Sequence, residues 1–167
     1  CGIVGFKPSF GRIPLDGIAP LGPSFDTLGP LARDIADARR IFHVMAGIPV
    51  AETAPFRSMR VGVPALAQLD PCDPDVLRNF ERSLEALRAM GHDIVTLPFP
   101  KALTEYQALS GGIIAYEAYR QHNSVVEDDA TPLDPHVRRR VLAGRDIGER
   151  RYAELIGQRR VDIAAFK

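Results

Sequence analysis

The chain has 167 residues, 46% of them hydrophobic and 25% charged, a composition typical of a globular protein long enough to bury a core. Its 21 basic and 21 acidic residues cancel, so we expect neither a nucleic acid nor a membrane surface as a partner. No apolar run approaches the roughly 20 residues that a membrane-spanning helix needs. Two cysteines without a disulfide framework favour a reducing, cytoplasmic location.

The N-terminal segment begins with apolar residues interleaved with glycine. Residues 3–6 predict a buried strand, and residues 7–9 end it, because Pro8 offers no N–H to a strand ladder. An irregular loop follows, held in extended pieces by Pro20, Pro23 and Pro30. A long loop of this kind is usually functional or disordered, and its apolar content favours order.

A helix is expected over residues 31–46, because apolar side chains recur there at steps of three and four. This stripe comprises Leu31, Ile35, Ala38, Phe42 and Met45. Gly47 supplies a left-handed stop after it. His43 lies beside the stripe without a second ligand at helical spacing, so a structural or surface histidine is favoured over a metal ligand.

Residues 59–97 predict a strand–helix–strand unit. Residues 59–64 alternate as a strand, residues 74–90 form an amphipathic helix, and residues 93–97 give a second short strand. A unit of this kind predicts a parallel strand pair joined by a crossover helix.

The start of that helix carries an acidic cluster. Asp73 is expected to cap the helix, with Pro74 at its first position and Asp75 favourable to the helix dipole. The alternative interpretation is a metal site made of Asp70, Cys72, Asp73 and Asp75. Capping explains the cluster better, because it lies at a helix start and lacks a histidine.

From residue 101 the sequence predicts helices to its end. A helix over residues 103–122 contains Gly111–Gly112, which marks a kink, a close helix contact or the start of a second helix. Asp134 is expected to cap a short helix over residues 135–144, and a last helix covers residues 148–166.

Two kinds of charged run interrupt this helical part. The acidic residues 127–129 predict a solvated loop. Residues 138–140 and 150–151 are arginines, which we interpret as solvated helix faces that pair with nearby acids. Phosphate binding is a distant alternative, given the zero net charge.

Several blocks of this sequence resemble the amidase signature family of serine amide hydrolases. The specific blocks are Cys1-Gly-Ile-Val-Gly-Phe-Lys-Pro-Ser-Phe-Gly-Arg-Ile-Pro14 and Phe25-Asp-Thr-Leu-Gly-Pro-Leu-Ala-Arg-Asp34, and the weaker ones are Ala115-Tyr-Glu-Ala-Tyr-Arg120 and Leu133-Asp-Pro-His-Val-Arg-Arg-Arg140. The resemblance implies a partial amidase-type α/β fold, with a mixed sheet of a few strands flanked by helices and a helix-rich C-terminal half. We expect one partial domain over residues 1–167, with a β/α portion to residue 100 and a helical portion from residue 101.

The resemblance also implies a Ser–cis-Ser–Lys triad, whose nucleophilic serine lies in a glycine- and serine-rich signature immediately before the equivalent of Cys1. This chain lacks those positions: Lys7 belongs to the Lys-Pro-Ser element, and Gly111–Gly112 is followed by Ile113 instead of serine. Both ends therefore look cut. We expect a fragment that is inactive alone, from a parent that hydrolyses a small-molecule amide and needs neither metal nor organic cofactor.

No other catalytic motif replaces the missing triad. Zinc-ligand spacings, phosphate-cradling glycine loops and the Gly-x-Ser-x-Gly turn are absent from the sequence. Asp26 and Thr27 remain as candidate substrate-binding residues, because by resemblance their loop lies near the floor of the amidase site. The simpler interpretation is that Asp26 accepts hydrogen bonds from loop amides and Thr27 bonds to the start of the helix.

Two alternatives stay open. The start Cys1-Gly-Ile-Val-Gly5 also resembles class II glutamine amidotransferases, in which the terminal cysteine is the nucleophile and its α-amine the base. That family's Arg-Gly, Asn-Gly and Gly-Asp pairs are absent, so a small buried strand residue is favoured for Cys1. The other alternative is a stand-alone, non-catalytic interaction module. A fragment should expose an unpaired strand near residues 3–6 and form homo-oligomers through that sheet edge, whereas a module should be a monomer.

Overall fold

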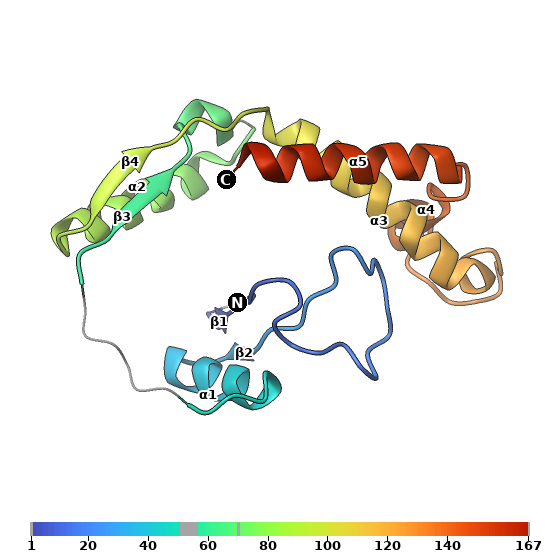
Figure 1. Cartoon of the computed structure of the whole chain (residues 1–167), viewed down its shortest axis with the longest axis horizontal. Helices are drawn as coiled ribbons and strands as arrows, with labels where there is room; N and C mark the ends of the chain where they lie inside the picture. The colour runs from blue at the N-terminus through green and yellow to red at the C-terminus, as the bar shows by residue number, and fades with distance from the viewer. Residues whose placement is uncertain (1, 51–56, 70, 167) are drawn as a thin grey trace. The chain divides into compact units, whose positions relative to one another are not determined.

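The computed structural model describes residues 2–50, 57–69 and 71–166 (Figure 1). Two compact units form: residues 2–50 with 110–159 make the N-terminal unit, and the described residues of 57–109 with 160–166 make the βαβ unit. The fold is mixed α/β with small sheets and is rich in helix, as predicted. One domain over the whole chain stays a prediction. Among the described residues, no helix has the length and apolar character to cross a bilayer.

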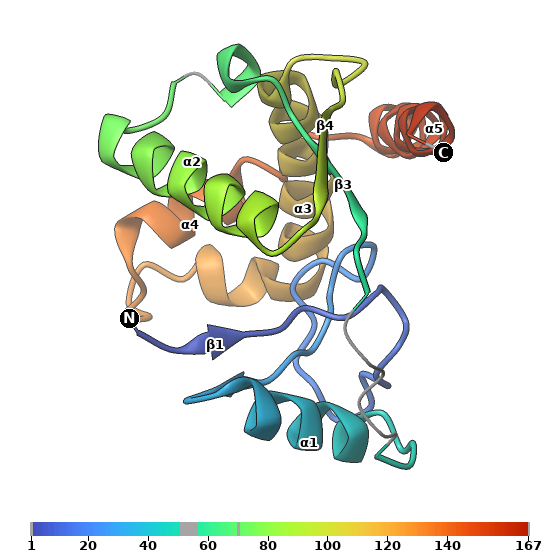
Figure 2. The same cartoon turned by 90° about the vertical axis from the view of Figure 1, so that its left-hand side faces the viewer.

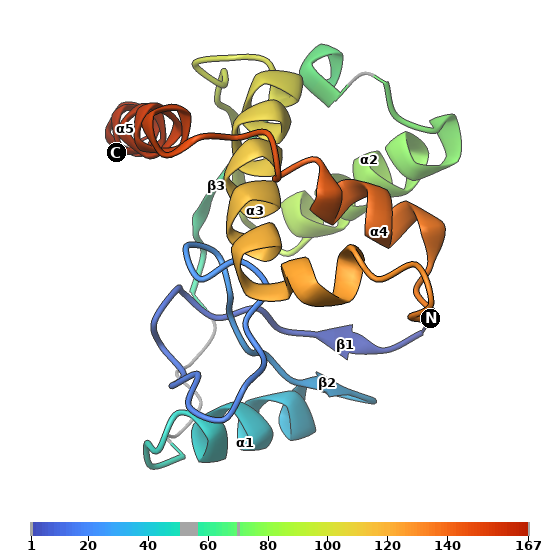
Figure 3. The same cartoon turned by 90° about the vertical axis from the view of Figure 1, so that its right-hand side faces the viewer.

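The N-terminal unit contains a two-stranded sheet. The strand predicted over residues 3–6 forms as β1 (Val4–Gly5), which pairs antiparallel with β2 (Leu31–Ala32) (Figure 3). Beyond the pair, Phe6 N–H donates to the Pro30 carbonyl at 3.0 Å. This pairing holds residues 31 and 32 extended.

The first helix therefore begins later than predicted. Helix α1 spans Ile35–Met45, and the predicted start at residue 31 is wrong. Asp34 is the N-cap: its backbone is extended and its carboxylate accepts a hydrogen bond from Asp37 N–H at 2.8 Å. An aspartate at this position satisfies one of the first-turn amides that have no partner within the helix.

Only part of the predicted apolar stripe of α1 is buried. Ala38 is 3% exposed, and the ring of Phe42 meets that of Phe6 edge to face at 5.1 Å. Leu31 and Ile35, in contrast, are 71% and 75% exposed. His43 is buried beside Phe42, which agrees with its interpretation as a structural residue.

The predicted strand–helix–strand unit is confirmed. Strand β3 (Arg60–Val63) precedes the 3₁₀ helix η1 (Leu66–Leu69) and α2 (Pro74–Ala89), and β4 (Asp93–Thr96) follows. The two strands are parallel over all four residue pairs. Helix α2 packs beside β4 (Figure 2).

Asp73 caps α2, as predicted. Its carboxylate accepts a hydrogen bond from Asp75 N–H at 2.7 Å, and Pro74 occupies the first helical turn. Asp70, a member of the alternative metal cluster, lies outside the described residues. Within the described part of the chain, no three His, Cys, Asp or Glu residues are grouped so that they could hold a metal ion.

Three helices complete the chain: α3 (Leu103–Val126), α4 (Pro135–Leu142) and α5 (Glu149–Ala165). Asp134 caps α4 by accepting two first-turn N–H groups at 2.8 and 3.1 Å, as predicted. In the βαβ unit, Lys101 Nζ donates to the carboxylate of buried Asp162 at 2.5 Å, and this hydrogen bond raises the pKa of Lys101.

The glycine pair of α3 is a close helix contact, which was one of the three alternatives. A Cβ added to Gly112 would lie 3.1 Å from Leu155 Cδ1 of α5. After α4, a Cβ on Gly144 would overlap the backbone carbonyl of Ala115. These glycines let α5 and the segment after α4 approach α3 closely.

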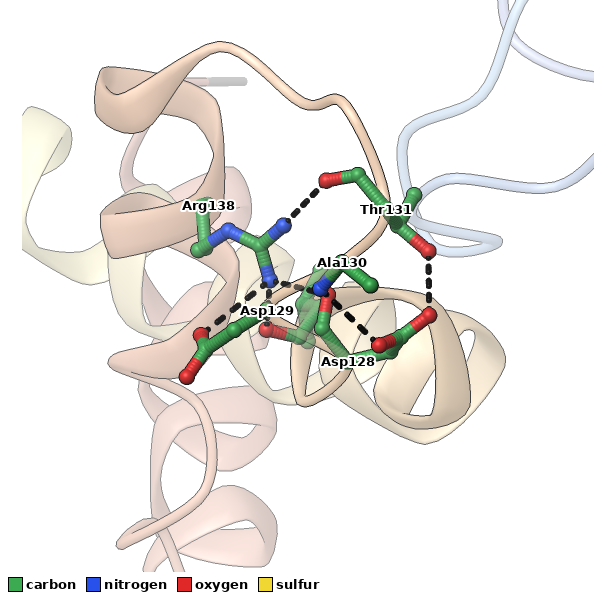
Figure 4. Close-up of polar contacts among 6 residues, drawn as sticks. Asp128, Asp129, Ala130, Thr131 and Arg138 are labelled. Atoms are coloured by element: carbon green, nitrogen blue, oxygen red, sulfur yellow. Dashed lines mark hydrogen bonds and ion pairs between the residues drawn. The ribbon is translucent and has the colours of Figure 1, made fainter.

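The end of α3 is fixed by Arg138 of α4 (Figure 4). Its guanidinium donates to the carbonyls of Val126, Asp128 and Thr131 at 2.5, 3.0 and 2.7 Å, and its ion pair with Asp129 spans 4.0 Å. The Thr131 hydroxyl donates to the Asp128 carboxylate and lowers the pKa of that group.

The interpretation of Arg138 as a solvated residue is wrong. Its side chain is 16% exposed, and it supplies donors that the carbonyls at the helix end need. The two following arginines are exposed.

Candidate functional site

Asp26 closes the turn of the proline-rich loop on which the candidate site residues lie. Its carboxylate accepts hydrogen bonds from Leu21 N–H at 3.0 Å and from Gly22 N–H at 3.1 Å. The Gly22 carbonyl in turn accepts the N–H groups of Phe25 and Asp26 at 2.7 and 2.9 Å. This confirms the simpler interpretation of Asp26, and the loop is ordered by its own hydrogen bonds.

Ser24, at the tip of this turn, binds a buried carboxylate on α3. Glu117 Oε2 accepts Ser24 N–H at 2.9 Å, and Oε1 accepts the Ser24 hydroxyl at 2.5 Å. The Tyr152 hydroxyl of α5 donates to the same Oε1 at 2.6 Å. Glu117 is 7% exposed, and a buried carboxylate needs donors of this kind to offset the loss of its water.

Arg159 of α5 completes the arrangement. Its guanidinium donates to the Ser24 carbonyl at 3.0 Å and lies over the Phe25 ring at 4.4 Å. The rings of Tyr152 and Tyr116 stack at 4.2 Å, nearly parallel. Ser24, Glu117, Tyr152 and Arg159 are called the Glu117 cluster below.

A cavity of about 520 Å³ lies beside the Glu117 cluster. Besides the cluster itself, it is lined by Phe10, Pro23, Tyr116, Arg120 and Gln121. The guanidinium of Arg120 lies 5.2 Å from the centre of the Tyr116 ring. The wall therefore combines aromatic rings with two arginines, the amide of Gln121 and the polar groups of Ser24, Glu117 and Tyr152.

The Glu117 cluster is suited to hold the loop on α3 and α5, and not to activate Ser24 as a nucleophile. A carboxylate is a weaker base than the histidine that commonly activates serine nucleophiles. Burial raises the pKa of the Tyr152 phenol, and its hydrogen bond to Glu117 raises it further. Tyr152 therefore stays protonated and keeps donating to Glu117.

The remaining predicted site residues are not gathered at this cluster. Thr27 is half-buried next to Asp26, and Asp34 holds the cap of α1 that Thr27 was expected to support. Lys7 donates to the carbonyl of Pro8 at 3.0 Å. Cys1, the alternative nucleophile, lies outside the described residues.

Reasoning from the sequence missed the Glu117 cluster, although one signal was available. Glu117 lies four residues after Ile113, which is fully buried, so the carboxylate lies on the apolar face of α3. A charged residue on such a face is rarely buried without a partner. The identity of its partner, 93 positions away at Ser24, was not readable from local pattern.

The comparisons with known proteins agree with this architecture. The model of the Amidase family matches residues 1–158. The chain is 30% identical to a glutamyl-tRNA(Gln) amidotransferase subunit of Novosphingobium aromaticivorans, in a match that covers 86% of this chain and 36% of that protein. It is also 30% identical to the 2-amino-5-chloromuconic acid deaminase of Comamonas testosteroni, over 90% of this chain and 34% of that protein.

A solved structure described as an amidase superposes with a TM-score of 0.84 at 30% identity, covering 98% of this chain and 38% of that one. The chain thus spans little more than a third of the length of these relatives. The match of the family model covers nearly all of this sequence, and the chain belongs to the amidase family.

Proposed function

We propose that this chain forms part of an amide hydrolase, supplying a wall of the substrate pocket and not the nucleophile. The observation that carries the proposal is the family match over residues 1–158, in a sequence without counterparts of the triad. Its lysines are Lys7, Lys101 and Lys167, and both described ones are engaged elsewhere. The chain alone then has no amide hydrolase activity.

In this proposal the whole enzyme cleaves the C–N bond of a small amide through an acyl-enzyme on serine, without metal or organic cofactor. Such a reaction requires a serine activated by a base and donors for the developing oxyanion. The substrate is a small amide or glutamine. We place the protein in the cytoplasm.

The proposed contribution of this chain is the loop that carries Asp26 and Thr27. Asp26 fixes the backbone of this loop, and Thr27 follows it directly, half-buried. A loop with a fixed backbone can orient a substrate or the segment that carries the nucleophile.

We further propose that the chain forms homo-oligomers through its N-terminal sheet. Within the described residues this sheet has two strands, so each strand has an edge without a strand partner. Ile3, Phe6 and Leu31 are 49%, 44% and 71% exposed on and beside it. Exposed strand edges and apolar side chains together favour association.

The lack of catalysis is tested by ammonia release. The purified chain, incubated with glutamine and a panel of simple amides, should release no more ammonia than buffer does, while a full-length family member serves as the positive control. Intact mass after treatment with a glutamine-analogue alkylator should be unchanged. Ammonia release together with one adduct on Cys1 would contradict the proposal and favour the N-terminal-cysteine mechanism.

The role of the loop is tested in a full-length family member. Replacing the aspartate that matches Asp26 by alanine should lower kcat/KM by at least about 10-fold, because loss of geometry at a reacting centre is costly. The free energy of unfolding is measured in parallel. Unchanged turnover at unchanged stability would eliminate the functional role of Asp26.

Self-association is tested by sedimentation velocity at increasing protein concentration. The chain should sediment faster as concentration rises, and Leu31→Lys should reduce this shift by placing a charge beside the sheet edge. Val76→Lys is the matched control, because Val76 is 56% exposed on α2, away from that sheet in the chain. A monomer at all concentrations would favour the interaction module instead.

A further inference from the structure

The Glu117 carboxylate joins two segments that are far apart in the sequence. Two of its hydrogen bonds come from Ser24 on the loop, and the third comes from Tyr152 on α5. All three are donated to the carboxylate, which as an anion has only acceptors to offer. Hydrogen bonds to an ionised group are roughly twice as strong as those between neutral groups.

The loop backbone is shaped to reach this carboxylate. Gly22 is buried, and a Cβ at this position would lie 3.4 Å from Glu117 Oε2 and 3.6 Å from a side-chain carbon of Ile114. A side chain larger than one methyl group would therefore push the loop away from α3. Gly22 N–H also donates a hydrogen bond to the Asp26 carboxylate. Gly22 therefore belongs both to the turn that Asp26 closes and to the contact with Glu117.

Other polar groups of the loop and of the cavity wall have partners other than this carboxylate. His122 Nε2 lies 2.6 Å from the carbonyl of Pro20, where α3 departs from helical geometry. Arg159 donates to the Ser24 carbonyl. Arg120 lies over Tyr116 and forms a long, exposed ion pair with Glu149, at 3.6 Å. In the described part of the chain, the hydrogen bonds to the Glu117 carboxylate come from Ser24 and Tyr152.

We propose that Glu117 is a positioning residue: its ionised carboxylate fixes the loop of residues 21–27 on α3 and α5, and thereby places Asp26 and Thr27. The proposal rests on the proposed function only for what the loop does in the enzyme. The placement itself is a property of this chain and is measurable without amide turnover.

The direct test is hydrogen–deuterium exchange of the full chain with Glu117→Gln. Glutamine keeps the shape but presents an amide donor where the carboxylate had an oxygen, so either Ser24 N–H loses its acceptor or both hydroxyls must turn. Peptides that cover residues 20–28 should exchange roughly 5- to 30-fold faster, the range that 1–2 kcal/mol produces. Peptides from β3 and β4 should keep their wild-type rates.

A second measurement, the absorbance titration of the tyrosines, tests the effect of the charge at position 117. Tyr152 is one of four tyrosines, and its raised pKa depends in part on Glu117. In Glu117→Gln, the Tyr152 phenol should therefore titrate at lower pH, whereas Tyr119, whose pKa is raised by its hydrogen bond to Glu127, should be unaffected. Glu117→Asp, which retains the charge on a shorter side chain, should restore part of the protection of the loop and part of the titration.

Glu149→Gln is the matched control, because this glutamate is 85% exposed and should leave both readouts unchanged. Should Glu117→Gln fail to fold, Ser24→Ala removes one donor from the loop side and should still loosen residues 20–28. Wild-type exchange of the loop in Glu117→Gln, or in Ser24→Ala, would overturn the proposal. So would an equal increase over all peptides, since that pattern indicates general destabilisation and not placement of the loop.

Discussion

The Glu117 carboxylate lies inside the N-terminal unit at 7% exposure, where an unpaired charge would cost several kcal/mol. The unit meets this cost by bringing three donors to it, from a loop near residue 24 and from Tyr152 on α5. The loop, α3 and α5 are therefore joined through one carboxylate. The loop closes its turn with the hydrogen bonds to Asp26, and the carboxylate on α3 holds that turn against the helices.

Close approach of backbones is the condition that makes this arrangement possible. Gly22 leaves room for the carboxylate, Gly112 leaves room for Leu155, and Gly144 leaves room for the backbone of Ala115. A Cβ on Gly144 would overlap backbone, one on Gly112 would crowd Leu155, and at Gly22 a side chain larger than a methyl group would push the loop away from α3. The glycines explain how a unit with little sheet still holds its loop, α3 and α5 in contact.

The sequence predicted the features that depend on neighbouring residues. Asp73 and Asp134 cap their helices because an N-cap needs only the amides two or three positions ahead, and the parallel strands follow from the spacing of apolar runs. Features that depend on distant partners were missed. Pairing with β1 keeps β2 extended, so α1 begins later than predicted. Arg138 donates to the carbonyls at the end of α3 instead of lying in solvent. The sequence predicted the hydrogen bonds that Asp26 accepts from the loop, but not the hydrogen bonds from Ser24 to Glu117.

These contacts hold the loop that carries the candidate site residues. Asp26 and Thr27 lie on a loop whose turn Asp26 itself closes and whose contacts with α3 and α5 run through Ser24. Under the proposed function, the bond-breaking step belongs to residues outside this sequence.

The central claim is that the Ser24 and Tyr152 hydroxyls act together on one buried carboxylate, and a double-mutant cycle measures this directly. The free energy of unfolding would be determined for the wild type, Ser24→Ala, Tyr152→Phe and the double variant, by far-UV circular dichroism in urea because the chain has no tryptophan. The account predicts that the double variant loses at least about 0.5 kcal/mol more than the sum of the single losses, since Glu117 then retains one of its three donors. Additivity within about 0.3 kcal/mol would show that the two hydroxyls act independently and would contradict the account.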